Sequence, residues 1–341
     1  MPLSQQPTIS IIIPVYNGGD AFQSCLIHAF ALTPSPLEII VVADGDTDGS
    51  RDLAKAFGAK VLINPISKGP AQARNVGAQH AHGDMLFFVD ADVTLPPNAL
   101  SLMIHAFQTE PELAALIGSY DDAPAEKNFL SQYKNLFHHY VHQTSCEQAS
   151  TFWGACGAIR RDIFLEMGGF DEQYRHPSIE DIELGYRLTK AGHRLKLVKA
   201  LQVKHLKHWN AASLIKTDFW QRAIPWTFLI LRDRKFTNDL NLKRANRVSV
   251  ILVYSLLLAL PFLAWQSSFL NLFIAFLAGG LLAINIPVYR FLLKKRGFLF
   301  TLQMMPWHWF YYFYSGLAFA AVFAYMAFQI MIFKKGVALG C

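Results

Sequence analysis

Two long uncharged stretches near the end of the chain most restrict what it can fold into. Val248–Tyr289 is 42 residues long and Gly297–Phe333 is 37 residues long, and neither contains an Asp, Glu, Lys or Arg. A helix needs about 20 apolar residues to cross a membrane. We therefore predict an α-helical membrane region at 248–341 with about three spans, at about 248–265, 269–289 and 309–333. Pro306 is predicted to separate the third span from an apolar lead-in at 298–305.

The basic residues predict how this region is oriented. All 25 acidic residues lie at or before Asp239, so the net charge of +6 belongs to the apolar tail and indicates a membrane, not a nucleic acid, as partner. Basic residues precede the first span and follow the second, which by the positive-inside rule places the N-terminal domain in the cytoplasm. A bacterial inner membrane suits this multi-pass architecture. Three spans would leave Lys334 and Lys335 outside, against the same rule.

Residues 1–210 show the pattern of an α/β domain. Apolar runs at 9–15, 37–43, 60–64 and 85–90 alternate with helical stretches at 19–31, 49–57 and 70–81. Such continuous apolar strands are typical of a doubly wound, mainly parallel sheet that is covered on both faces. A ligand then binds beyond the carboxyl ends of the strands. Polar residues stand at these ends, at Tyr16-Asn17, Asp44-Gly-Asp and Asp90-Ala-Asp.

Asp90 and Asp92 directly follow the buried strand Met85–Val89, and two carboxylates at this spacing suit Mg²⁺ or Mn²⁺ held together with phosphate oxygens. Alone, such a pair is as consistent with a solvated strand end. Asp44 fits hydrogen bonding to a nucleotide base or ribose, or an ordinary Asp-Gly turn. Arg74 is suited to a phosphate contact or to the protein surface.

Taken in order, six segments resemble the signature blocks of family 2 inverting glycosyltransferases with the GT-A fold. They are SIIIPVYN from Ser10, IIVVADGDTDGS from Ile39, ARNVG from Ala73, FVDAD from Phe88, GGFDE from Gly168 and EDIELGYRL from Glu180. The resemblance covers about residues 8–210. It implies a UDP- or GDP-sugar donor, a divalent Mn²⁺ or Mg²⁺ ion, and single-displacement transfer with inversion.

The resemblance also implies roles for individual residues. Pro14, Tyr16 and Asp44 would line the nucleotide base, with Arg74 and Asn75 nearby. Asp90 would contact ribose or metal, Asp92 would coordinate the metal, and His205 is a further candidate ligand, with His208 the alternative. Asp181 would be the catalytic base within the pair Glu180-Asp181. In the second block Ala43 replaces the first of two acids that are usual in the family, and Asp46 stands where Ser is common.

Elementary chemistry supports two of these roles. A bound cation offsets the negative charge that gathers on a leaving nucleoside diphosphate. A carboxylate such as Asp181 can take the proton of the attacking hydroxyl. Because acidic residues also stabilise helix N-termini, Glu180 and Asp181 could serve stability alone.

His138, His139 and His142 are predicted to lie on a surface helix at 128–143. Trp153 is predicted either to stack on a sugar or to belong to the core.

Residues 211–247 are predicted to connect the catalytic domain to the membrane. Asp218–Arg234 mixes aromatic and basic residues, as an interfacial helix does, although a plain linker on lipid headgroups is equally compatible. Gln221–Trp226 is similar to the Gln-x-x-Arg-Trp motif of processive polysaccharide synthases, but Pro225 stands where the Arg should be. We therefore predict a transferase acting on a lipid or lipid-linked acceptor. A processive synthase and an inactive sugar-nucleotide-binding membrane protein are the alternatives.

Overall fold

The computed structural model describes residues 6–233, 240–265 and 267–338, so Arg234 of the predicted interfacial helix and Gln266 of the predicted connector lie outside the described residues. The chain divides into two compact units, Met1–Ala211 (unit 1) and Ala212–Cys341 (unit 2).

Unit 1 is built on one sheet with the strand order β3-β2-β1-β4-β8-β6-β9-β5, and β7 pairs with β9. The four strands at the β3 end are parallel, whereas β8 runs antiparallel between β4 and β6. The α/β sheet expected from the sequence is confirmed, with a mixed half beyond β4. Its strands are β1 (Ile9–Val15), β2 (Glu38–Asp44), β3 (Lys60–Asn64), β4 (Met85–Val89), β5 (Val93–Thr94), β6 (Leu113–Tyr120), β7 (Gln148–Ala149), β8 (Cys156–Arg160) and β9 (Arg194–His205).

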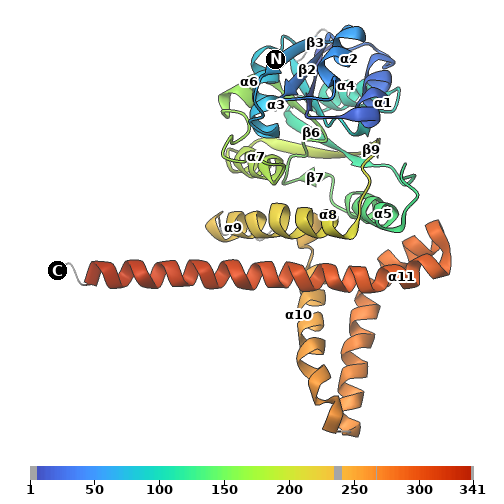
Figure 1. The fold of residues 1–341 in the computed structure, drawn as a ribbon, viewed down its shortest axis with the longest axis vertical. Coiled ribbons are helices and arrows are strands. Elements are labelled where there is room, and N and C mark those ends of the chain that lie inside the picture. Colours follow the sequence, from blue (N-terminus) through green and yellow to red (C-terminus); the bar gives the residue numbers. More distant parts are fainter. Residues whose placement is uncertain (1–5, 234–239, 266, 339–341) are drawn as a thin grey trace. The chain divides into compact units, whose positions relative to one another are not determined.

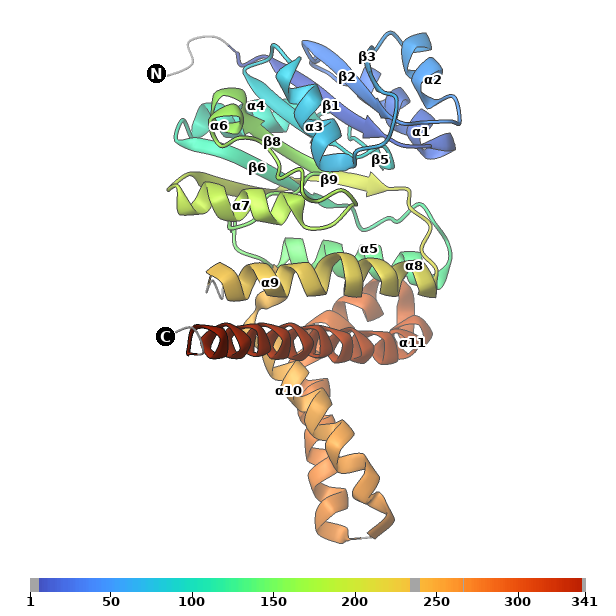
Figure 2. The ribbon, with the colours of Figure 1, turned by 60° about the vertical axis from the view of Figure 1, so that its left-hand side comes forward.

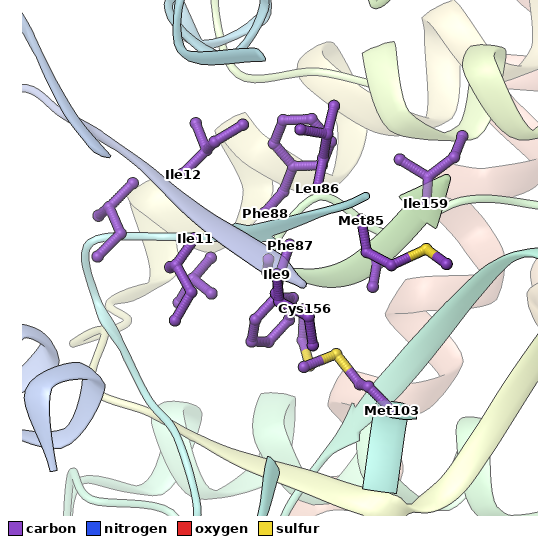
Figure 3. Close-up of a cluster of buried hydrophobic side chains, with 14 of the residues drawn as sticks. Ile9, Ile11, Ile12, Met85, Leu86, Phe87, Phe88, Met103, Cys156 and Ile159 are labelled. Atoms are coloured by element: carbon purple, nitrogen blue, oxygen red, sulfur yellow. The ribbon is translucent and has the colours of Figure 1, made fainter. Parts of the chain in front are cut away.

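Helices lie on both faces of this sheet (Figures 1 and 2). They are α1 (Gly19–Phe30), α2 (Ser50–Ala56), α3 (Pro70–Gln79), α4 (Ala99–Thr109), α5 (Phe129–Gln143), α6 (Arg161–Glu166) and α7 (Glu180–Lys190). Between the layers, central strands bury nearly all of their side chains, as Figure 3 shows for β1, β4 and β8. Each such Ile, Leu or Phe stabilises the fold by about 1.5–3 kcal/mol relative to an exposed position. This core holds the strand ends rigidly at one edge of the sheet.

Unit 2 is entirely helical over its described residues. It contains α8 (Ala211–Ile215), the π-helix η1 (Lys216–Ala223), α9 (Ile224–Asp233), the 3₁₀ turn η2 (Leu240–Leu242), α10 (Arg244–Ala259), η3 (Leu260–Trp265) and α11 (Ser268–Ala338). Among the described residues, two helices are long and apolar enough to cross a membrane, Arg244–Leu263 and Ser268–Gln329, and their most apolar 18-residue windows have mean hydropathies of 1.8 and 2.1.

The break in α11 does not lie where the sequence predicted it. Pro306 is accommodated inside the helix, and the interruption is at Gly297, whose φ of 82° and ψ of −178° are not helical. A backbone with this φ is open to glycine and strained for other residues. The predicted break at Pro306 is therefore wrong, and the second and third predicted spans both belong to α11.

Candidate active site

The candidate site lies where the strand order of unit 1 reverses. From β1 the chain continues to β2 and β3 on one side, whereas β4 pairs with the other side of β1. In doubly wound sheets the crevice at such a reversal, beyond the carboxyl ends of the strands, is where ligands bind. The residues that follow β1 and β4 here are Tyr16 and Asp90, which the sequence had singled out.

Arg74 on α3 ties three of the motif segments together. Its Nη2 donates to Asp90 Oδ1 at 2.6 Å and its Nη1 donates to Glu180 Oε1 at 2.9 Å, and the residue is buried. Burial alone would lower the pKa of Arg74, but the charges of Asp90 and Glu180 outweigh it and raise that pKa. Arg74 therefore remains charged and joins the end of β4 to the start of α7.

The two neighbouring acids at the start of α7 have different surroundings. Glu180 is 4% exposed, and its second oxygen accepts the Ser178 amide at 2.9 Å. Asp181 is half-buried, and its Oδ2 accepts the Gly154 amide at 3.0 Å. Its Oδ1 accepts the amide of Ile182 at 2.8 Å. Glu180 is thus held in a buried ion pair, whereas the half-buried Asp181 carboxylate is held by backbone amides.

Asp92 approaches His205, the last residue of β9. The His205 Nε2 and Asp92 Oδ2 atoms are 3.5 Å apart, and the Asp92 side chain is 34% exposed. Burial would raise the pKa of Asp92, but the charge and hydrogen bond of His205, followed by the charge of Lys207, lower it. Among the described residues, no three His, Cys, Asp or Glu side chains converge as a ready metal cluster. A carboxylate and an imidazole nevertheless suit Mn²⁺ with coordination positions left for phosphate oxygens.

Asp44, the last residue of β2, is buried and fully hydrogen-bonded in the structure. Its two oxygens accept Asn64 Nδ2 and Ser67 Oγ, both at 2.8 Å, and the amides of Lys68 and Gly69. The carboxylate thereby fixes the loop between β3 and α3. A contact of Asp44 with a nucleotide base stays a prediction.

Of the other residues predicted to bind the nucleotide, Asn75 is engaged within the protein and Tyr16 is exposed. Asn75 anchors the segment after α6, because its amide group exchanges hydrogen bonds of 2.8 Å with the backbone of Phe170 and donates to Glu172 Oε1 at 2.9 Å. Pro14 lies near the end of β1, and Tyr16, just beyond it, is 62% exposed. Tyr16 is therefore available for a ligand, whereas Asn75 acts within the protein.

The histidine-rich helix α5 does not lie on the surface as predicted. His139 and His142 are buried against β6, where their Nδ1 atoms lie 2.7 Å from the Tyr120 carbonyl oxygen and 3.1 Å from that of Gly118. Burial lowers the pKa of His142 to about 4. Trp153 is 9% exposed and packs edge-on against Tyr120, so it belongs to the core.

Tyr120 is a site residue that the sequence reasoning missed. Its ring stacks on His205 at a centroid distance of 4.5 Å and an interplanar angle of 11°. Tyr120 ends β6, a strand buried along its whole length and absent from the predicted strands. The apolar run Leu113–Ile117 was the available signal, and the rule that strand ends carry sites would then have indicated Tyr120.

Comparison with known proteins shows which families the chain resembles. The profile described as glycosyl transferase family 2 matches residues 10–168, and that of the N-terminal domain of galactosyltransferase matches residues 136–210. Residues 10–168 of this chain are therefore similar to glycosyltransferase family 2. A mannosyltransferase from Pyrobaculum calidifontis, solved with GDP-Man and Mn²⁺, superposes with a TM-score of 0.51 at 15% identity, covering 93% of this chain and 88% of that one. This likeness concerns the GT-A-like fold.

Two relatives of this chain are named for their activities. A poly-β-1,6-N-acetyl-D-glucosamine synthase of Staphylococcus aureus is 24% identical over 74% of this chain and 64% of its own length. A glucosyl-dolichyl phosphate glucuronosyltransferase of Haloferax volcanii is 22% identical over 62% of this chain and 74% of its own. Four further bacterial glycosyltransferases match, and the chain spans only 32% to 55% of their lengths.

Proposed function

We propose that this chain is a membrane-anchored inverting hexosyltransferase that moves a sugar from a UDP- or GDP-sugar to a lipid or lipid-linked acceptor. The observation that carries the proposal is the unequal pair at the start of α7. Glu180 is neutralised by Arg74, and Asp181 is left half-exposed with a carboxylate held by two backbone amides. A positioned, ionised carboxylate beside a donor site is what a single-displacement transfer needs.

In the proposed reaction Asp181 takes the proton from the acceptor hydroxyl group. The acceptor oxygen forms a bond to the anomeric carbon from the face opposite the leaving group, and the bond from that carbon to the diphosphate oxygen breaks. The nucleoside diphosphate leaves with the electron pair, and the configuration at the anomeric carbon is inverted. The amides of Gly154 and Ile182 hold the Asp181 carboxylate in a fixed orientation.

Donor binding is assigned to the edge formed by the ends of β1, β2 and β4. Tyr16, Pro14 and Asp44 flank the proposed base site, and Asp90 is placed for the ribose or the metal. Asp92 and His205 would hold the divalent ion, Mn²⁺ or Mg²⁺, with Asp90 as a further ligand once it leaves Arg74. When bound, this ion supplies positive charge to the departing diphosphate.

Unit 2 supports the membrane part of the proposal. Its apolar helices and the basic residues beside them favour a multi-pass anchor in a bacterial inner membrane, with unit 1 in the cytoplasm. η1 and α9 combine exposed Trp220 with Arg222 and Arg232, the composition of an interfacial helix. An acceptor that is itself anchored in the membrane would meet the enzyme at this surface. The dolichyl phosphate substrate in the name of the Haloferax relative is in keeping with it.

A processive polysaccharide synthase is the second candidate, since one relative is named as such. Pro225 disfavours it, because proline cannot supply the guanidinium of the Gln-x-x-Arg-Trp motif. An inactive sugar-nucleotide-binding protein has no need for Asp90, Asp92 and Asp181 together. These carboxylates therefore favour turnover over binding alone.

The test is transfer of labelled sugar from a panel of UDP- and GDP-sugars, in membranes that contain the full chain and Mn²⁺. Asp181→Asn should reduce the label in organic-extractable lipid by about 10²- to 10⁴-fold. Asp162→Asn is the matched control. Asp162 also lies in the first turn of a helix and accepts the next amide, from Ile163 at 2.8 Å, but it is exposed on α6. Label in a ladder of polymer lengths would overturn the lipid acceptor, and equal activity of the two variants would overturn the role of Asp181.

A further inference from the structure

The last part of α11 runs in a different direction from the helices that precede it. We call α10, η3 and residues 268–296 the hairpin, and residues 298–338 the arm. The interruption at Gly297 separates them, directly after the basic residues Lys294, Lys295 and Arg296. Figures 1 and 2 both show the arm crossing the hairpin instead of running along it as a third antiparallel helix.

Polar contacts fix this crossing at the end of the hairpin that carries its charges. Tyr312 Oη donates to Asn285 Oδ1 at 2.7 Å, and the Asn285 amide donates to Ser249 Oγ at 3.0 Å. Tyr254 Oη donates to the carbonyl oxygen of Phe313 at 2.9 Å. A Cβ atom on Gly316 would lie 2.4 Å from the Tyr254 ring, so the close approach requires glycine. These hydrogen bonds and the close contact of Gly316 with Tyr254 thus hold the arm across the hairpin.

Beyond the crossing the arm runs beside η1 and α9. Tyr314 Oη donates to Asp218 Oδ2 at 2.8 Å, and the rings of Tyr325 and Phe228 meet edge-on at 5.8 Å. From Tyr314 to Tyr325 an α-helix advances about 16 Å, and the two partners are separated by a similar number of residues on the other helix. The two segments therefore lie side by side over this length. The segment formed by η1 and α9 carries Asp218 and four further charged residues, Lys216, Arg222, Arg232 and Asp233.

A segment with this many charges is costly to place in hydrocarbon, so it belongs at the membrane surface. An arm that runs along it stays at the same depth. The arm exposes large apolar side chains along its length, among them Leu317, Phe319, Phe323, Phe328 and Met331. Trp307, Trp309 and Tyr311, near its start, are residue types that favour the interface.

We propose that the arm lies along the cytoplasmic leaflet of the membrane and does not cross it, so that the chain has two spans and both termini on one side. The proposal names the cytoplasmic side from the function proposed above, but the same-side relation does not depend on it. Lys334 and Lys335 then lie on the same side as the basic run before Gly297, which removes the violation of the positive-inside rule.

The chain's own cysteines test this topology. Cys146 is exposed on unit 1, Cys25 and Cys156 are buried, and Cys341 is the last residue. Cys341→Ser leaves Cys146 as the reporter for unit 1, and Cys146→Ser leaves Cys341 as the reporter for the arm. Ser267→Cys, with Cys146→Ser and Cys341→Ser, reports the tip of the hairpin. Each variant is treated with a membrane-impermeant maleimide in spheroplasts and in inverted vesicles.

We expect Cys146 and Cys341 to be labelled in inverted vesicles, and the thiol introduced by Ser267→Cys to be labelled in spheroplasts. Labelling of Cys341 in spheroplasts with Cys146 in inverted vesicles overturns the proposal and restores three spans. Labelling of both native cysteines in spheroplasts upholds the lying arm and overturns the cytoplasmic placement instead. None of these readouts requires transferase activity, so a failure of the proposed function is distinguishable from a failure of the topology.

Discussion

Replacing Arg74 with methionine tests whether the buried ion-pair network organises the site. Methionine has a similar length but no charge, so the substitution leaves the carboxylate of Glu180 buried without its partner at 2.9 Å. Asp90 also loses its partner, but its side chain is 35% exposed and water can compensate. The cost of the substitution therefore comes mainly from Glu180.

The size of this cost can be bounded in two ways. Removing one partner of a buried ion pair destabilises proteins by about 3–5 kcal/mol. Protonation can relieve an unpaired carboxylate, and protonating a carboxyl group of ordinary acidity at pH 7 costs about 4 kcal/mol. We expect Arg74→Met to lower the free energy of unfolding of unit 1 by about 3–4 kcal/mol at pH 7. Because the folded variant then binds a proton that the unfolded chain releases, the loss should shrink by roughly 1.4 kcal/mol per pH unit below 7.

The buried thiols of Cys25 and Cys156 provide the assay. Burial raises the pKa of both thiols, so they react with a thiol reagent only when unit 1 opens. Their labelling is followed in increasing urea on the full chain in detergent. Arg74→Met with Glu180→Gln should recover at least half of the loss, because the uncompensated charge is gone.

Lys55→Met is the matched control, since Lys55 pairs with Asp52 at 3.4 Å on the surface and both side chains are more than half exposed. It should cost less than about 0.5 kcal/mol. If Arg74→Met and the double variant are equally unstable, the buried charge of Glu180 is not what Arg74 compensates.

Three further predictions address the site and its support. His142 has a pKa lowered to about 4, so the unfolded chain binds its proton first as the pH falls. Stability should be complete above about pH 6.5 and fall by ~3 kcal/mol towards pH 4, and His142→Gln should flatten this profile in the same urea assay. Gly185→Ala should destabilise unit 1 by more than about 2 kcal/mol and reduce transfer, because its Cβ would lie 2.1 Å from the Phe152 amide nitrogen. Gly279 is a helical glycine with open space around it, so Gly279→Ala should neither destabilise the protein nor reduce transfer. His205→Ala should raise the Mn²⁺ concentration for half-maximal transfer at least about tenfold with little change at saturation, and an unchanged Mn²⁺ dependence would remove His205 from the metal site.

The order of strands and helices in unit 1 could be predicted because its central strands are buried on both faces. The run Ile9–Val15 has Ser10 as its one polar residue, and its bounds agree with the structure. The strand predicted at 85–90 ends one residue earlier, at Val89. β6 and α5 were harder to predict, because the burial of each depends on its packing against the other. His139 and His142 look like surface residues until a neighbouring strand supplies the carbonyl groups that they contact.

The break in α11 illustrates a different limit. Proline is the usual signal for a helix end, yet Pro306 lies nine residues after Gly297, inside the helix that Gly297 begins. The sequence contains several glycines in this region, and only the backbone shows which one has a positive φ. Likewise, residue spacing did not reveal that the Asp44 carboxylate accepts hydrogen bonds from the loop after β3. That loop is brought to Asp44 by the parallel pairing of β2 and β3.

The neighbouring acids Glu180 and Asp181 share the same local position in the helix but have different partners. Both acids stand at a helix N-terminus, where either is stabilising. Arg74 reaches one of them from α3 and the Gly154 amide reaches the other from the loop before β8. A lone acid could not both pair with Arg74 in the interior and accept the Gly154 amide from the other side. If Asp181 is the base as proposed, Glu180 is a positioning residue, and its loss should disturb stability before chemistry.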